Sequence, residues 1–192
     1  MQQFDEMYSQ ASATQPGSPV RAHYKAYADW LAGQSDSSML ARREEAEMIF
    51  RRVGITFAVY GDKDEDGAGT ERLIPFDLIP RIIPAHEWTS MQKGLVQRVN
   101  ALNMFIHDVY HEQGILKAGI IPSEQILNNA QYRPEMRWVD VPHKVYSQIS
   151  GIDIVRAPDA QGNGEYYVLE DNLRVPSGVS YMLEDRKMMM RL

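Results

Sequence analysis

The stretch SGIDIVRAPDAQGNGEYYVLEDNLRVPSG, residues 150–178, decides the fold of this chain. Its YYVL run, residues 166–169, is aromatic and β-branched, a composition that favours a strand. The segment 158–164 before this run is rich in Pro, Gly and Asn, which break regular structure, and another apolar run precedes it. Two such runs around a group of breakers are typical of a β-hairpin, so we predict two strands joined by a polar turn.

The predicted hairpin carries acidic and amide side chains at fixed positions. Asp153 lies on the first strand, and Glu170 and Asn172 end the second. Side chains two residues apart on a strand point to the same side, and pairing of the strands brings Asp153 toward the same patch. Two carboxylates and one amide oxygen suit Mg²⁺, a hard cation that usually also binds substrate phosphates. These three residues alone fit a solvated, acidic hairpin end equally well.

The loop after the second strand favours the metal site. Arg174 follows the predicted ligands closely, and Pro176, Ser177 and Gly178 come next. A tight loop with a cation and free backbone donors can hold a phosphate group. The hairpin and its loop together therefore predict a site for a metal-bound nucleotide.

These residues resemble a known family. An aspartate on one strand, Glu-x-Asn on the next and a Pro/Gly loop resemble the magnesium signature of ATP-grasp ligases. The wider sequence resembles the circularly permuted branch of that superfamily, which includes glutathionylspermidine synthase-like proteins and many uncharacterised bacterial relatives. The resemblance covers residues 73–192 and rests on three stretches: IPFDLIPRIIPAHEW, HDVYHEQGILKAGIIP and VLEDNLRVPSGVSYMLEDRKMMMRL.

The resemblance implies a fold and a reaction. The expected fold is α+β, the metal-binding part of a permuted ATP-grasp fold, with a mixed or antiparallel sheet and packed helices. The expected activity is ATP-dependent joining of a carboxylate to an amine through an acylphosphate, with small-molecule or peptide substrates and with ATP and Mg²⁺ as cofactors. Asp153, Glu170 and Asn172 would then hold Mg²⁺, and Arg174 would stabilise the transferring phosphoryl group. Backbone amides around Ser177 and Gly178 would cradle the acylphosphate or the carboxylate.

One position departs from the family pattern. ATP-grasp enzymes often carry an arginine two residues before the metal aspartate, and here that position is Gly151. Either Arg156 or Arg174 takes over the contact with the phosphoryl group, and the spacing leaves both choices open.

Length is a second departure. Members of this branch are much longer, and their adenine pocket and phosphate-binding lysines lie beyond the permuted metal strands. We therefore expect this chain to be the front part of a larger protein, whose missing C-terminal part is its partner. Two alternatives stay open: a noncatalytic nucleotide- or protein-binding module of ATP-grasp ancestry, and a kinase-like phosphotransferase.

Composition limits the class of protein. The chain has 192 residues, a net charge of −6 and no Cys, so disulfides, zinc–thiolate sites and thiol nucleophiles are excluded. The acidic balance and the lack of a Lys/Arg cluster argue against binding of nucleic acid. The apolar runs are too short to span a bilayer, and the N-terminus lacks a signal-peptide pattern. We expect a cytoplasmic protein that binds neither nucleic acid nor membrane.

Periodicity predicts the remaining elements. Residues 1–35 are expected to form a mobile arm with a short docking helix, and residues 36–192 a partial permuted ATP-grasp domain. A helix is expected from Ser38, with N-caps at residues 36–38, to Gly54. Strands are expected at residues 55–60 and 71–79 and helices at residues 87–113 and 122–128.

Two further motifs suggest metals but have plainer interpretations. Residues 62–67 match the start of a calcium loop, yet Leu73 stands where its last ligand, a glutamate, belongs, so we interpret them as a solvated turn. His107 and His111 are one helical turn apart, as in zinc proteases, but Asp108 replaces the usual Glu and no third ligand is evident nearby. We interpret the two histidines as partly buried or capping residues.

Arg81 fits either a phosphate contact or an ion pair with Asp77.

Overall fold

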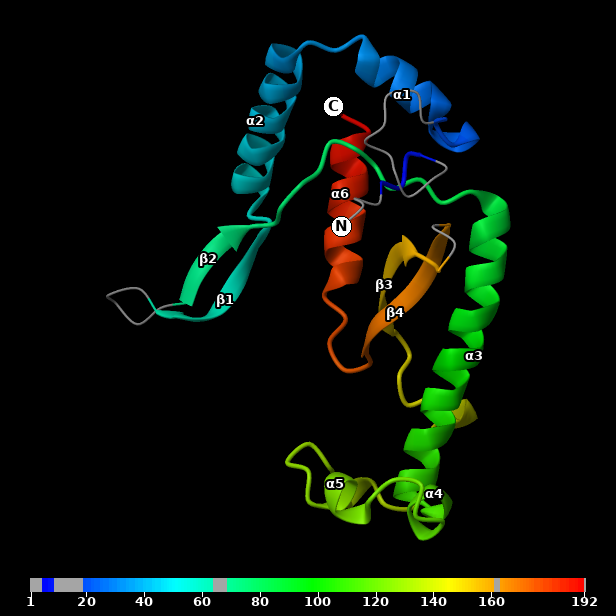
Figure 1. The fold of residues 1–192 in the computed structure, drawn as a ribbon. Helices are drawn as coiled ribbons and strands as arrows, with labels where there is room; N and C mark the ends of the chain where they lie inside the picture. Colours follow the sequence, from blue (N-terminus) through cyan, green and yellow to red (C-terminus); the bar gives the residue numbers. More distant parts are fainter. Residues whose placement is uncertain (1–4, 9–18, 64–68, 161–162, 192) are drawn as a thin grey trace. The chain divides into compact units, whose positions relative to one another are not determined.

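The computed structural model describes residues 5–8, 19–63, 69–160 and 163–191 (Figure 1). The elements are η1 (Ala22–Tyr24), α1 (Lys25–Ala32), α2 (Asp36–Val53), β1 (Thr56–Lys63), β2 (Gly69–Leu73), α3 (Ala85–Tyr110), α4 (Gly114–Lys117), α5 (Ser123–Leu127), η2 (Pro134–Met136), η3 (Pro142–Lys144), β3 (Gly151–Pro158), β4 (Gly164–Asn172) and α6 (Gly178–Met189). They belong to two compact units. The first comprises residues 1–84, 155–167 and 177–192, and the second comprises residues 85–154 and 168–176.

Helix α2 of the first unit has capping residues at both ends. The Ser35 side chain accepts a hydrogen bond from the Ser38 amide at 3.2 Å, so the helix begins two residues before the predicted start and its N-cap is Ser35. Gly54 ends the helix with a φ of 77°, a left-handed conformation that costs little without a Cβ. The predicted end at Gly54 is confirmed.

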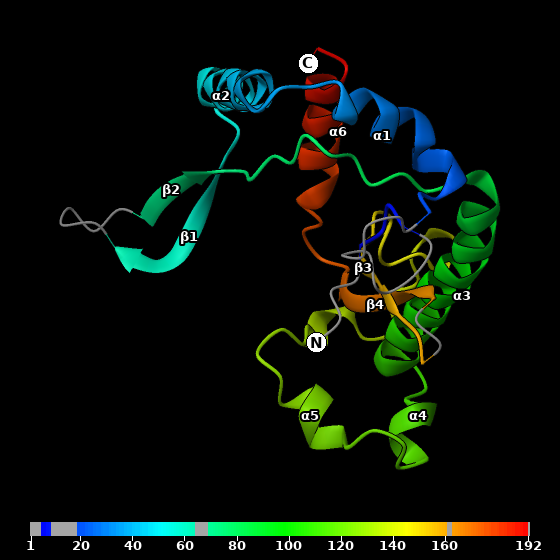
Figure 2. The same ribbon diagram turned by 45° about the horizontal axis from the view of Figure 1, so that its top comes forward.

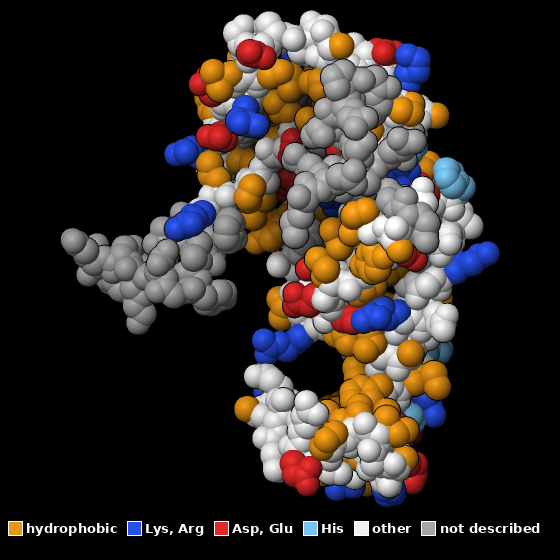
Figure 3. Space-filling view, in the orientation of Figure 1, with side chains coloured by type: hydrophobic (Ala, Val, Ile, Leu, Met, Phe, Trp, Pro, Cys, Tyr) orange, Lys and Arg blue, Asp and Glu red, His pale blue; other side chains and the backbone are white. Residues whose placement is uncertain are grey.

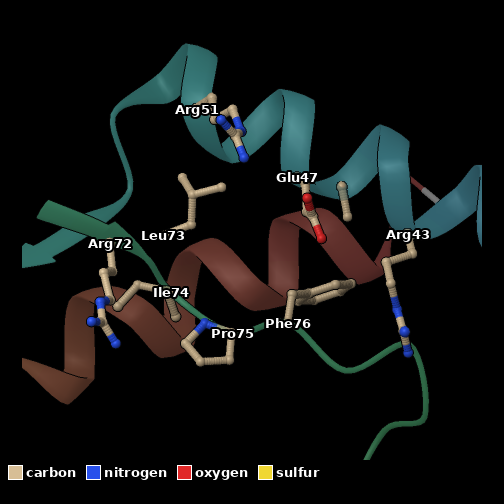
Figure 4. Close-up of a pocket in the computed structure, with 9 residues that line it drawn as sticks. Arg43, Glu47, Arg51, Arg72, Leu73, Ile74, Pro75 and Phe76 are labelled. Atoms are coloured by element: carbon tan, nitrogen blue, oxygen red, sulfur yellow. The ribbon is translucent and has the colours of Figure 1, made fainter.

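The core of the first unit forms where α2 meets α6. Ala46, Phe50 and Met188 are buried together, and the ring of Phe76 meets that of Phe50 edge to face at 5.4 Å. Figure 4 shows the segment after β2 passing between these two helices, with Phe76 pointing toward α2. Apolar side chains from three separate stretches of sequence therefore stabilise this unit by excluding water.

The predicted docking helix is present as η1 and α1. Tyr24 is 1% exposed, and its hydroxyl oxygen accepts a hydrogen bond from the Ile82 amide at 2.8 Å. The Tyr27 hydroxyl donates to the Leu78 carbonyl at 2.6 Å. The helix thus packs on the extended segment that precedes α3, while the mobility of residues 1–35 stays a prediction.

Strands β1 and β2 pair antiparallel, with Thr56 opposite Leu73 (Figure 2). The second strand is shorter than predicted because Pro75 and Pro80 lack the amide that a ladder needs. Most of the calcium-like motif, residues 64–67, lies outside the described residues. Arg81 pairs with Glu6 at 3.0 Å, whereas Asp77 accepts from the Ile79 amide, so the proposed pair of Arg81 with Asp77 does not form.

The second unit is built on α3 and parts of the β3–β4 hairpin. Strands β3 and β4 pair in a two-stranded sheet, which confirms the predicted hairpin. Helix α3 ends at Tyr110, earlier than predicted, because the Asp108 carboxylate accepts hydrogen bonds from the amides of Gly114 and Ile115 at 2.8 and 2.9 Å and starts α4. Across the described ranges, no helix is long and apolar enough to cross a membrane.

Truncation of the Phe50 side chain tests the core. Phe50 is 2% exposed, so Phe50→Ala should lower the free energy of unfolding of the chain by about 3–5 kcal/mol, through lost burial and a cavity. Met48 lies on the same helix and is 61% exposed, so Met48→Ala should change it by less than about 0.5 kcal/mol. Urea unfolding measures both values, and equal effects would contradict the assigned core.

Candidate metal and nucleotide site

The structure brings two of the three predicted metal ligands into contact. The Nδ2 atom of Asn172 on β4 donates to Oδ1 of Asp153 on β3 at 3.4 Å. Asp153 and Glu170 are exposed, and Asn172 is half-buried. Within the described part of the chain, neither of the two carboxylates forms an ion pair with a basic side chain.

The backbone around Gly151 shows which face of the hairpin these residues share. A Cβ atom placed on Gly151 would lie 3.4 Å from the Cβ of Asn172, so the two positions project to the same side. Asp153 is two residues after Gly151, and Glu170 is two residues before Asn172, so both also project to that side. Asp153, Glu170 and Asn172 therefore lie on one face of the hairpin.

Close packing around Gly151 explains why this position departs from the family pattern. A Cβ at Gly151 would lie 2.9 Å from the Cβ of Pro176, closer than real Cβ atoms approach another atom. The loop after β4 thus folds back over Gly151, the position where the family pattern led us to expect an arginine. An arginine there would force Pro176 to move.

Arg98 on α3 holds the opposite face of β4. Its Nε and Nη2 atoms donate to the two carboxylate oxygens of Asp171 at 2.7 and 2.6 Å. These hydrogen bonds from Arg98 lower the pKa of the Asp171 carboxyl, so the pair is charged at neutral pH. Because neighbouring side chains on a strand alternate, anchoring Asp171 to α3 turns Glu170 and Asn172 away from the helix. Figure 3 shows acidic and basic side chains gathered near β4 and the middle of α3.

Asn103 on α3 positions the chain that enters β3. The side chain is buried, and its Oδ1 accepts hydrogen bonds from the backbone amides of Tyr146 and Ser147 at 2.7 and 3.0 Å. Its Nδ2 donates to the Val99 carbonyl at 3.1 Å. The Ser147 hydroxyl in turn reaches the Leu173 carbonyl at 3.2 Å, just after the last predicted ligand. Asn103 and Ser147 therefore tie both ends of the hairpin to one helix.

Arg174 lies on the exposed surface of the second unit. Its Nη1 donates to Oε1 of Gln131 at 3.1 Å. Two acids close to Arg174 in the sequence have other basic partners: Asp171 binds Arg98, and Glu184 binds Lys187. A guanidinium held by one neutral amide keeps other donors for an anionic ligand.

The other three predicted binding residues belong to the first unit. The half-buried guanidinium of Arg156 lies 5.7 Å from the ring centre of Tyr166 and fills the space that a side chain at Gly164 would need. Gly178 is the first residue of α6, and Ser177 precedes it. The first amides of a helix have no partner within the helix, which suits them to bind an anion.

Sequence reasoning missed the residues that support the hairpin. Arg98 and Asn103 read as ordinary polar positions of an amphipathic helix, because their partners are far away along the chain. Gly151 was noticed only as a departure from the family pattern. Its close approach to Pro176 needs the folded loop to become visible.

Comparison with known sequences identifies the family. Residues 80–192 match the family model described as a circularly permuted ATP-grasp. The chain is 41% identical over 174 residues to an uncharacterised protein of Synechocystis, and the matched region is 91% of this chain and 34% of that protein. It is 37% identical over 189 residues to an uncharacterised protein of Mycobacterium leprae, and the matched region is 98% of this chain and 30% of that protein. The chain belongs to the circularly permuted ATP-grasp family.

Another relative carries a name that concerns function. A Frankia casuarinae protein with the provisional name glutamate–cysteine ligase 2-2 is 42% identical over 144 residues, which is 75% of this chain and 15% of that protein. The chain spans about a third of the length of its Synechocystis and Mycobacterium relatives. The predicted resemblance to the permuted ATP-grasp branch and to uncharacterised bacterial relatives is thus confirmed.

Replacement of Asn103 tests the support of the hairpin. Asn103→Ala leaves two backbone amides without their acceptor, so it should lower the free energy of unfolding by about 2–4 kcal/mol. Asn100 is exposed on the same helix, and Asn100→Ala should cost less than about 0.5 kcal/mol. Urea unfolding of both variants measures the difference. Equal stabilities would mean that water replaces the carboxamide at no cost.

Proposed function

We propose that the complete protein containing this chain is an ATP-dependent carboxylate–amine ligase, and that this chain supplies its magnesium-binding hairpin. The observation that carries the proposal is the projection of Asp153, Glu170 and Asn172 to one face of β3 and β4. Family membership supports ATP-grasp chemistry. The ligase name of the Frankia relative supports joining of an acid to an amine.

The donor set fits magnesium. Mg²⁺ prefers carboxylate and amide oxygens and keeps several waters, and exposed carboxylates leave room for those waters. Asn172 now turns its Nδ2 toward Asp153, and rotation of the amide by half a turn would present Oδ1 to a cation. When bound, Mg²⁺ neutralises charge on the phosphates during phosphoryl transfer.

Each candidate site residue has a definite task in the proposed reaction. The substrate carboxylate attacks the γ-phosphorus of ATP, ADP leaves, and an acylphosphate forms. The amine then attacks the acyl carbon, inorganic phosphate leaves with the bonding electrons, and the nitrogen loses a proton. Asp153, Glu170 and Asn172 would hold the Mg²⁺ ion, and Arg174 would donate to the phosphoryl oxygens that gain charge. Arg156 and the amides at Ser177 and Gly178 are proposed as further contacts to phosphate or substrate.

The test of this function is ADP release by the complete protein. Release that depends on both an added acid and an added amine supports a ligase. Tight ATP binding without turnover would instead indicate a noncatalytic module, and transfer of phosphate to a hydroxyl would indicate a kinase-like enzyme. Acids and amines related to glutamate and cysteine are the first to try, because of the name of the Frankia relative.

Replacement of one carboxylate tests the metal site. In the complete protein, Glu170→Gln removes a charge at nearly constant size, so kcat should fall by about 100-fold or more while the melting temperature stays the same. Glu165 lies on the same strand but projects to the other side, because side chains alternate along a strand. Glu165→Gln is therefore the matched control and should keep kcat. Equal activity of both variants under saturating Mg²⁺ would remove Glu170 from the site.

Replacement of Arg174 separates phosphate binding from a structural role. Arg174→Lys keeps the charge but loses the planar set of donors that matches phosphate, so kcat should fall by about tenfold or more with little change in stability. Arg174→Ala should lower kcat further, and Arg137→Lys, another exposed arginine of the second unit, should leave it unchanged. Intact turnover with a reduced melting temperature would assign Arg174 a structural role and favour Arg156 for the phosphate.

A further inference from the structure

Two histidines and an aspartate cluster at the end of α3, apart from the residues of the proposed ligase site. One ring nitrogen from each of His107 and His111 and one carboxylate oxygen of Asp140 lie within 4.8 Å of one another. The Nε2 of His111 is 3.4 Å from Oδ1 of Asp140. Two ligands of a tetrahedral zinc ion, each about 2.0–2.1 Å from the metal, are about 3.3 Å apart. One edge of the cluster therefore already has the spacing of a zinc site.

Hydrogen bonds to the other ring nitrogens orient both imidazoles as ligands. Nδ1 of His111 is 2.8 Å from the His107 carbonyl oxygen, which can only accept, so Nδ1 carries the proton and Nε2 presents its lone pair. Nδ1 of His107 is 2.9 Å from the Tyr146 hydroxyl, which itself donates to the Val139 carbonyl at 3.4 Å. When the hydroxyl donates to Val139, it accepts from His107 Nδ1, and His107 Nε2 then presents a lone pair. Metal-binding histidines are usually held in this way.

Among the residues that the structure describes, none forms a hydrogen bond with the buried Nε2 atom of His111, although Oδ1 of Asp140 lies 3.4 Å away. Its side chain is only 10% exposed. A buried polar atom that lacks a partner costs free energy, and proteins rarely leave one without a reason. A cation bound between this nitrogen and the Asp140 carboxylate would satisfy both groups.

The segment that carries Asp140 is held against α3 in a strained conformation. The Trp138 amide donates to the Tyr110 carbonyl at 2.9 Å, and the indole meets the His111 ring edge-on at 5.6 Å. Trp138, His143 and Lys144 all have φ values near 60°, at 63°, 57° and 57°, which are costly for residues with a Cβ. Such strain persists only where surrounding structure enforces it, and it is commonly found at ligand sites.

We infer that His107, His111 and Asp140 bind a divalent transition-metal ion of the zinc type. Two imidazole nitrogens and one carboxylate oxygen are ligands that zinc prefers, and a fourth position is open to water. A cavity of about 650 Å³ lies beside the histidines, and its lining includes Asn100, Met104, His143 and Lys144. Asp140 is the third ligand, which the sequence near the histidines did not reveal. The two histidines therefore act as metal ligands in addition to the partly buried or capping role that we interpreted from the sequence.

This site has a structural role rather than that of a zinc protease. Asp108, the residue in the position of the protease general base, is engaged in capping α4 and has both carboxylate oxygens occupied. A metal on His107, His111 and Asp140 would fasten the 138–146 segment to α3. The end of that segment and the residue after it, Tyr146 and Ser147, bind through their backbone amides to Asn103. Asn103 lies one helical turn before His107 on α3. The inference does not depend on the proposed ligase activity.

Zinc titration of the chain tests the inference. The 192-residue chain, stripped with a chelator, is titrated with ZnCl₂ in a calorimeter and with CoCl₂ while visible absorption is followed. We expect saturable binding of a single zinc ion, cobalt bands typical of four-coordinate geometry, and a rise in melting temperature of about 5–10 °C at a hundredfold excess over Kd. His111→Gln and Asp140→Asn should each weaken zinc binding by at least about tenfold.

The variants include a matched control and a safeguard against unfolding. His86→Gln, at an exposed position near the start of the same helix, should bind zinc as the original chain does. Asp140 has a side chain that is 76% exposed, so Asp140→Asn should fold even if His111→Gln does not. No saturable zinc binding, or equal binding by the Asp140→Asn variant and the original chain, would overturn the inference. Loss of binding in the His86→Gln variant would place the metal elsewhere and overturn it too.

Discussion

The buried side chain of Asn103 is the contact on which the second unit depends. One oxygen binds the amides of Tyr146 and Ser147, two consecutive backbone groups that would otherwise be buried without an acceptor. Ser147 carries the constraint to Leu173, so the start of β3 and the end of β4 are set by the same residue of α3. An apolar residue at position 103 would fill the space but leave the loop without a fixed register.

Anchoring to α3 also decides which side of the hairpin carries the proposed magnesium ligands. The bidentate pair of Arg98 with Asp171 fixes one face of β4 against the helix, and alternation along the strand directs Glu170 and Asn172 to the other face. The fold of the loop over Gly151 then leaves no space there for the arginine expected from the family pattern. A few polar contacts therefore set both the position of the hairpin and the side to which these residues project.

The two proposed sets of metal ligands differ in chemistry as well as in place. The hairpin offers oxygen atoms on an exposed surface, a donor set that suits the proposed hydrated magnesium ion. The cluster at the end of α3 offers two oriented imidazoles, one of them almost fully buried, and nitrogen ligands favour zinc over magnesium. A buried ligand held by hydrogen bonds suits a resident ion that stabilises a loop.

Local patterns in the sequence were sufficient for the α+β class, the hairpin, the helix end at Gly54 and the shared face of His107 and His111. Each of these depends on residues within a few positions of one another, where strand alternation, helical spacing or a missing Cβ acts directly. The partners of Asn103, the pairing of Arg98 and the third ligand Asp140 were decided only by tertiary structure. Their groups meet because the chain folds back on α3, and a contact between distant residues leaves no periodic trace in the sequence.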